Sequence, residues 1–192
     1  MGNLASVFKA INRLKKNVVI TFDKKEIKKA SLIILPGVGS FEQGMKNLKE
    51  RDIIDVLFEE VIKNKKPFLG ICLGMQLIME MGVEPIECKG LGWIKGKVQA
   101  INNCSLPVPH LGWNKIYKPG EEKIKDTLFN NFYFIHSYHV IPEEEVVYTL
   151  VDYEFPMIAS IQKENIFATQ FHPEKSQDAG LKLLKTYLEY NA

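Results

Sequence analysis

Short apolar runs alternate with longer segments of helical period through the first half of this 192-residue chain. A run that is apolar along its whole length fits a strand buried on both faces, and a helix between two such strands lets them lie parallel in one sheet. The sequence therefore predicts an α/β fold in three layers, with helices on both faces of a mostly parallel sheet. The strands expected here are 18–21, 32–35 and 67–71, and the helices are 4–15, 41–64 in one or two pieces, and one from about 75.

The second half of the chain has a different pattern, because its apolar runs follow one another with only short turns between them. Strands joined in this way normally pair antiparallel. We therefore expect an antiparallel extension of the sheet, followed by a closing helix from about Asp178. The strands expected in this half are 133–136, 146–151, 158–161 and 166–170.

Size and composition favour a single domain over residues 1–192, because 46% of the residues are hydrophobic and one domain typically takes roughly 100 to 200 residues. The formal net charge of +2 is too small to indicate binding to nucleic acid or to a membrane. No apolar run approaches the roughly 18 to 20 residues that a membrane-spanning helix needs, and residues 1–15 lack the apolar stretch of a signal peptide. We therefore expect a cytoplasmic protein.

The cysteines Cys72, Cys88 and Cys104 are odd in number and form no C-x-x-C pair, so neither a disulfide framework nor a metal site is expected. Cys72 stands apart in Gly70-Ile71-Cys72-Leu73-Gly74, at the end of a predicted strand. In this pattern a sharp strand-to-helix turn lifts a nucleophile out of the sheet, and the start of the helix favours its thiolate. The five residues alone leave open that Cys72 is a small buried hydrophobic residue.

A nucleophilic thiolate needs a proton carrier, and the candidate is His172 in Phe171-His172-Pro173-Glu174. Residues two apart in an extended segment share a face, so Glu174 would hold the imidazole in one tautomer. Pro173 favours extended geometry at His172 and ends the strand. A surface turn is the alternative interpretation of this motif. Three other histidines have no carboxylate two residues away: His110, His136 and His139.

With these motifs the chain resembles the triad (class I) glutamine amidotransferases, and most closely the glutaminase subunits of imidazole glycerol phosphate synthase. The likeness covers nearly the whole chain and implies the flavodoxin-like fold of that family. The segments that carry it are Pro36-Gly37-Val38-Gly39-Ser40-Phe41, Gly70-Ile71-Cys72-Leu73-Gly74-Met75-Gln76-Leu77, Pro109-His110-Leu111-Gly112-Trp113-Asn114, His136-Ser137-Tyr138 and Gln170-Phe171-His172-Pro173-Glu174-Lys175-Ser176.

The resemblance implies a role for each matching residue. Cys72 would attack the side-chain amide of glutamine to give a glutamyl thioester and ammonia, while His172 carries the protons and Glu174 orients it. The oxyanion would be stabilised by backbone donors of four residues: Leu73, Gly37, Val38 and Gly39. The residues that match positions holding substrate glutamine are Gln76, His136, Ser137 and Tyr138.

In that family the glutaminase forms a heterodimer with a (β/α)8-barrel cyclase, and ammonia passes inside the complex to an intermediate of histidine biosynthesis. The resemblance therefore implies a cyclase partner and L-glutamine as substrate, with no cofactor. Three alternatives stay open: a paralogous subunit that feeds another synthase, such as one that amidinates a surface sugar; a stand-alone hydrolase of γ-glutamyl compounds; and a non-catalytic regulatory or scaffolding subunit.

The beginning of the chain departs from the family pattern. Members usually open with a β-strand that ends in a Tyr-Gly-Met-Gly-Asn-Leu-like turn, whereas this sequence starts at Met1-Gly2-Asn3-Leu4. We therefore expect the family's first strand to be missing here, as a late start or a truncation would produce. Its neighbours in the sheet would then have unpaired backbone groups.

Overall fold

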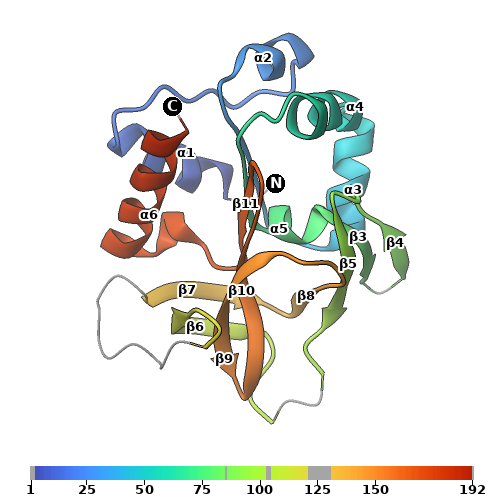
Figure 1. Cartoon of the computed structure of the whole chain (residues 1–192), viewed down its shortest axis with the longest axis vertical. Coiled ribbons are helices and arrows are strands. Elements are labelled where there is room, and N and C mark those ends of the chain that lie inside the picture. The colour runs from blue at the N-terminus through green and yellow to red at the C-terminus, as the bar shows by residue number, and fades with distance from the viewer. Residues whose placement is uncertain (1–2, 85, 103–104, 121–130, 192) are drawn as a thin grey trace.

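The computed structural model describes residues 3–84, 86–102, 105–120 and 131–191. Within these ranges the strands form two sheets (Figure 1). The larger runs in the order β1 (Ile33–Gly37), β2 (Phe68–Cys72), β11 (Ile166–Thr169), β10 (Phe155–Lys163), β9 (Val147–Tyr153), β6 (His110–Tyr117) and β7 (Asn131–His136). The smaller runs in the order β4 (Glu87–Lys89), β3 (Met79–Val83), β5 (Ile94–Ala100) and β8 (Tyr138–Pro142).

The larger sheet has a parallel part and an antiparallel part. Strand β2 pairs parallel with both β1 and β11, while β10, β9, β6 and β7 continue the sheet through antiparallel pairs. The predicted α/β class with an antiparallel extension is thus confirmed. The extension contains β6, which was not predicted, while the last predicted strand, 166–170, pairs parallel with β2 as β11.

Helices cover both faces of the parallel strands (Figure 1). On one side lie α1 and α6, and on the other lie α3, α4 and α5. The helical elements are α1 (Leu4–Arg13), α2 (Lys24–Lys29), α3 (Phe41–Glu50), α4 (Ile54–Phe58), the π-helical turn η1 (Glu59–Lys63), α5 (Leu73–Leu77), the 3-10 turn η3 (Pro173–Lys175) and α6 (Gln177–Tyr190). None of the helices in the described ranges is long and apolar enough to cross a membrane.

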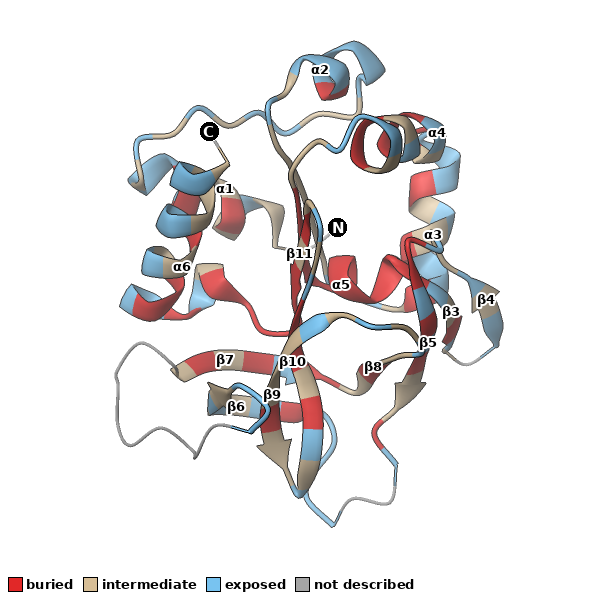
Figure 2. Cartoon of the chain, in the orientation of Figure 1, coloured by how far each residue is buried: buried red, intermediate tan, exposed pale blue. Residues whose placement is uncertain are grey.

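Strand β2 is buried along its whole length and lies between β1 and β11 in the larger sheet. Figure 2 shows its neighbour β11 at the centre, between the two groups of helices. Leu69 and Ile71 pack against α1 and α6, in a cluster that includes Ile11 and Leu184. Phe68 packs on the other side, in a cluster that includes Phe41 of α3. Each such side chain contributes about 1.5–3 kcal/mol by leaving water, so the strand that ends in Cys72 is firmly held.

The strand predicted at Val18–Thr21 is wrong, because the structure gives these residues no strand assignment. The larger sheet ends at β1 among the described residues, so the segment has no neighbouring strand with which to exchange backbone hydrogen bonds. It lines instead a cavity of about 590 Å³ whose other wall includes Ile33 to Pro36 of β1. Val19 and Ile20 are exposed as a result.

Candidate active site

Cys72 ends β2 in the tight turn that its motif predicts. Its backbone has φ 54° and ψ −106°, a conformation that costs a residue with a side chain about 1–3 kcal/mol and is typical of functional positions. Helix α5 begins at the next residue, Leu73, earlier than the expected start near Met75. A β-carbon on Gly74 would lie 1.8 Å from the carbonyl oxygen of Leu35, so only glycine lets α5 pack this closely on β1.

His172 and Glu174 form a buried pair. His172 Nδ1 lies 2.7 Å from Glu174 Oε1, and both side chains are 0% exposed. The sequence predicted that His172 and Glu174 would lie on one face of a strand. This reason is wrong, because β11 ends at Thr169 and Glu174 lies in the turn η3. His172 itself is extended, with φ −102° and ψ 94°, and the turn that Pro173 begins brings the carboxylate back to the ring.

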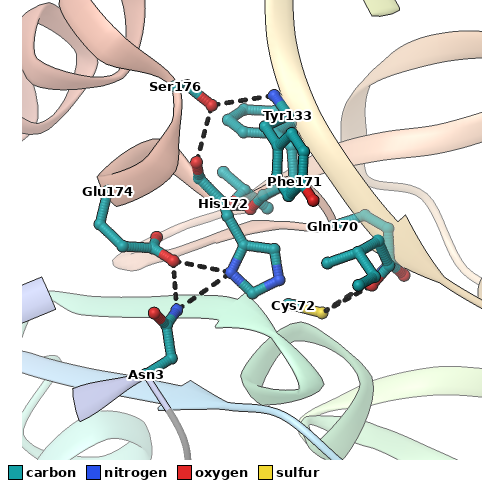
Figure 3. A network of polar contacts seen from close by, with 10 residues as sticks. Asn3, Cys72, Tyr133, Gln170, Phe171, His172, Glu174 and Ser176 are labelled. Carbon is teal, nitrogen blue, oxygen red and sulfur yellow. Dashed lines mark hydrogen bonds and ion pairs between the residues drawn. The ribbon is translucent and has the colours of Figure 1, made fainter. Parts of the chain in front are cut away.

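The backbone of His172 is fixed by two neighbouring elements (Figure 3). The His172 N–H donates to the carbonyl oxygen of Tyr133 in β7 at 2.9 Å. Ser176 Oγ donates to the carbonyl oxygen of His172 at 2.7 Å and accepts from the N–H of Tyr133 at 2.9 Å. The histidine is thereby tied to β7 and to the start of α6.

The imidazole of His172 faces Cys72 with its other nitrogen (Figure 3). Among the described residues, Nε2 has no partner with full hydrogen-bond geometry, yet the sulfur is close enough to act on the ring. Burial lowers the pKa of His172, but the contacts with Cys72 and then Glu174 outweigh it and raise the pKa from 6.5 to about 9. The arrangement favours an imidazolium whose Nε2 proton faces the sulfur of Cys72, which is the proton donor that a cysteine nucleophile needs.

Asn3, which the sequence did not single out, contacts this pair. Its Nδ2 donates to Glu174 Oε1 and lies 3.1 Å from His172 Nδ1. A carboxylate only accepts, so the proton between His172 and Glu174 sits on Nδ1. Because a protonated Nδ1 cannot accept, the Asn3 amide donates its hydrogen bond to Glu174. Asn3 precedes α1 with φ 85° and makes no side-chain cap to that helix. No spacing rule could have found it, because it lies 171 residues from Glu174 in the sequence.

Gln170 is a second residue that the sequence did not assign to the site. Its side chain is 0% exposed, and its Nε2 donates to Cys72 Sγ at 3.6 Å. Gln170 was within the recognised motif, but only the folded position of β11 beside β2 brings it next to the cysteine.

The residues expected to stabilise an oxyanion lie around the cysteine. Leu73 is the first residue of α5, and Gly37 is paired with Cys72 in the register of β1 and β2. Val38 and Gly39 follow in the loop after β1, where Gly39 has φ 106°, a conformation that favours glycine. The structure places all four near the strand end that carries the nucleophile.

The residues expected to hold glutamine lie on two different parts of the fold, α5 and the junction of β7 with β8. Gln76 is buried in α5, and its Nε2 donates to the carbonyl oxygen of Tyr138 at 3.1 Å and to Gln170 Oε1 at 3.2 Å. His136 ends β7 and Tyr138 begins β8, with Ser137 half-buried between them. Gln76 thus joins this segment to the surroundings of Cys72.

The competing histidines do not face the cysteine as free bases. His136 Nδ1 donates to the carbonyl oxygen of Tyr138 at 2.8 Å, and its Nε2 lies 3.0 Å from His110 Nδ1. Burial lowers the pKa of His136 to about 3 and also lowers the pKa of His110 and of His139. These rings are held neutral inside the fold, so His172 is the candidate proton carrier.

Cys88, the other cysteine that the structure describes, does not form a second site. Cys88 lies in β4, and burial followed by the charge of Glu42 raises the pKa of its thiol, which disfavours a thiolate. Cys104 lies outside the described residues. Within the described ranges there is also no group of histidine, cysteine and acidic side chains arranged to hold a metal ion.

Known proteins resemble this chain in sequence. The family model for glutamine amidotransferase class-I matches residues 3–188. The chain is 46% identical to imidazole glycerol phosphate synthase subunit HisH 1 of Campylobacter jejuni, over 97% of this chain and 94% of that protein. It is 44% identical to subunit HisH of Aquifex aeolicus, over 97% and 91%.

Solved structures agree at the level of the fold. A glutamine amidotransferase crystal structure superposes with a TM-score of 0.72 at 18% identity, covering 99% of this chain and 94% of that one. The glutaminase domain of the Trypanosoma brucei CTPS, solved with bound acivicin, gives a TM-score of 0.58 at 15% identity over 96% and 88%. Because the family model spans almost the whole chain and these relatives exceed 40% identity, the chain belongs to the class I glutamine amidotransferase family.

Proposed function

We propose that this chain is the glutaminase subunit of an imidazole glycerol phosphate synthase, which hydrolyses L-glutamine and passes the ammonia to a synthase subunit. The observation that carries the proposal is the buried His172–Glu174 pair facing a cysteine on a strained strand-to-helix turn. The names of the relatives from Campylobacter jejuni and Aquifex aeolicus support the choice of synthase. The pathway served is then histidine biosynthesis, which takes place in the cytoplasm.

The proposed chemistry follows from the different surroundings of the two imidazole nitrogens. The Cys72 thiolate attacks the amide carbon of glutamine, and the tetrahedral oxyanion accepts hydrogen bonds from Leu73 N–H and from the loop Gly37–Gly39. His172 Nε2 then gives its proton to the leaving nitrogen, so ammonia departs and a glutamyl thioester remains. In the second half, Nε2 takes a proton from water as the water attacks the thioester, and glutamate and thiolate are released. Glu174 keeps Nδ1 protonated throughout.

Substrate glutamine is proposed to lie between the elbow and the turn of residues 136–138. Ser137 and Tyr138 can offer polar groups there, while Gln76 and His136 act mainly by fixing that turn. The reason is that the Gln76 amide and both His136 ring nitrogens already have partners inside the protein. These roles rest on the motif match and on the hydrogen-bond path from Tyr138 through Gln76 and Gln170 to Cys72.

The partner is proposed to be a (β/α)8-barrel cyclase in a heterodimer, and an apolar strip on β6 and β7 is the proposed docking face. Leu111 and Ile135 pair across these strands and are 57% and 37% exposed, and Trp113 is 43% exposed. The strip adjoins the site, since the carbonyl oxygen of Ile135 lies 3.9 Å from Cys72 Sγ. Aromatic and aliphatic side chains of this kind are typical anchors of protein interfaces.

Glutamine hydrolysis by the chain together with its synthase subunit tests the proposal. Cys72→Ala should abolish glutamate release because it removes the nucleophile, whereas the matched variant Cys88→Ala should keep it. The chain alone should release glutamate far more slowly than the complex. Hydrolysis by Cys72→Ala at the level of Cys88→Ala would refute the assignment, and full activity of the isolated chain would favour a stand-alone hydrolase.

A further inference from the structure

The Cys72 sulfur is contacted by a side chain that no motif assigns to the chemistry. Gln170 follows the last residue of β11, and Thr169 is paired with Ile71, so Gln170 lies level with Cys72 on the neighbouring strand. Its backbone N–H donates to the carbonyl oxygen of Ala159 at 2.8 Å, which fixes the position of the residue. The side chain is fully buried and cannot turn towards solvent.

The orientation of the Gln170 amide follows from a chain of hydrogen bonds that starts at a backbone carbonyl. The carbonyl oxygen of Tyr138 can only accept, so the group of Gln76 that lies 3.1 Å from it must be the NH2. The same NH2 lies 3.2 Å from Gln170, and the atom that it meets there must be the oxygen. The other end of the Gln170 amide, which lies 3.6 Å from Cys72 Sγ, is therefore its NH2.

We infer that Gln170 is a further residue of the catalytic site, whose amide donates a hydrogen bond to the Cys72 thiolate and is held in that orientation by Gln76. A donor stabilises the charged form of an acceptor over its protonated form. A protonated thiol has another partner, because the carbonyl oxygen of Ile135 lies 3.9 Å from the sulfur. Gln170 thus favours ionisation from one side of the sulfur while His172 takes the proton on the other.

This inference rests on the proposed function for its meaning, but its test does not use glutamine. The rate at which iodoacetamide alkylates Cys72 in the full chain is followed against pH by peptide mass mapping. In Gln170→Met, which keeps the volume and removes the donor, the midpoint pH of alkylation should rise by about one unit, so that alkylation near neutral pH slows roughly tenfold. Gln76→Met should give a smaller rise, because the Gln170 amide can then turn.

Gln162→Met is the matched control, since Gln162 is an exposed glutamine on the adjacent strand β10, and its midpoint should not change. Gln170→Asn keeps an amide but shortens it, so it should show the same rise and serves if Gln170→Met does not fold. An unchanged midpoint in a folded Gln170 variant would overturn the inference. That outcome is separate from glutamine hydrolysis by Cys72→Ala, which would overturn the proposed function instead.

Discussion

The two nitrogens of the His172 imidazole face different groups. Glu174 holds Nδ1, and Asn3 in turn holds the carboxylate, while Nε2 faces the sulfur of Cys72. Being a buried histidine is not enough to raise the pKa, because the other three histidines are also buried and their pKa values are lowered. The chemistry therefore depends on residues that position the ring as well as on the ring itself.

Asn3 is expected to act as a positioning residue for this pair. Asn3→Ala removes the amide that donates to Glu174, and hydrogen bonds to charged groups contribute about 1.5–3 kcal/mol. We expect kcat for glutamine hydrolysis to fall about tenfold or more with little change in KM, because the amide does not contact substrate. Asn3→Asp should fall further, since it adds a second carboxylate beside Glu174.

The control for Asn3 is Asn12→Ala, which replaces an exposed asparagine on α1, the helix that Asn3 precedes. This variant should keep the kcat of the unchanged protein. A kcat for Asn3→Ala equal to that of Asn12→Ala would show that the contact with Glu174 has no part in catalysis.

The raised pKa of His172 also predicts how stability depends on pH. The pKa is about 9 in the folded protein against an ordinary value of 6.5, so the folded state binds this proton more tightly. The resulting stabilisation is complete below pH 6.5 and is lost as the pH rises through 9, a change of about 3 kcal/mol at most. Urea unfolding across this range should show a steeper loss in the unchanged protein than in His172→Asn. Parallel curves for the two proteins would contradict the assigned pKa.

At the scale of the elements, the close packing of α5 on β1 sets the position of the nucleophile. Gly74→Ala would place a β-carbon 1.8 Å from the carbonyl oxygen of Leu35, which is backbone and cannot move aside. We expect this variant to lose at least about 2 kcal/mol of unfolding free energy, along with hydrolysis.

Gly44→Ala is the matched comparison for Gly74→Ala, because Gly44 also lies in a helix near the site. Its β-carbon would meet only side-chain atoms of Leu73 and Leu77, at 3.0 Å or more. Those side chains can shift, and alanine gains about 1 kcal/mol over glycine within a helix. Chemical denaturation of both variants checks the prediction, and an equal loss would contradict it.

The sequence predicted elements whose signal is local and missed those that depend on distant partners. Helix α1 and the strand ending in Cys72 follow from periodicity and from the G-x-C-x-G pattern. The segment Val18–Thr21 has the composition of a strand but lacks a neighbouring strand in the described structure, so composition alone misled. The smaller sheet was not predicted either, because short, partly polar strands such as β4 carry little pattern.

In the candidate site, too, the sequence predicted residues with a local signal and missed those that depend on distant partners. Cys72, His172 and Glu174 were predicted because each lies in a compact motif, and the structure brings His172 to both of the others. The pairing of His172 with Glu174 arises from the turn at Pro173 rather than from strand parity. Asn3 and Gln170 were missed because only the fold places them beside residues about a hundred or more positions away.

At the scale of the whole molecule, the site lies next to the proposed docking face. Trp113 is the largest side chain of the apolar strip, and large aromatic residues often account for much of an interface's affinity. Trp113→Glu should weaken binding to the synthase subunit at least tenfold, or about 1.4 kcal/mol, because it would bury an unpaired charge. Titration of the two subunits by calorimetry measures this.

Tyr190→Glu is the control for the docking face, since Tyr190 is 88% exposed at the end of α6 and away from β6 and β7. The affinity of this variant for the synthase subunit should equal that of the unchanged protein. Equal affinities for the Trp113 and Tyr190 variants would place the partner on another face.

The central claim is that Cys72, His172 and Glu174 act together as one nucleophilic unit, and covalent labelling tests it most directly. A glutamine analogue with an electrophilic carbon in place of the side-chain amide should give one adduct per chain, which peptide mass mapping places on Cys72. His172→Asn should slow this labelling at least about tenfold. An adduct on Cys88, or labelling of Cys72 no faster than that of Cys88, would contradict the account.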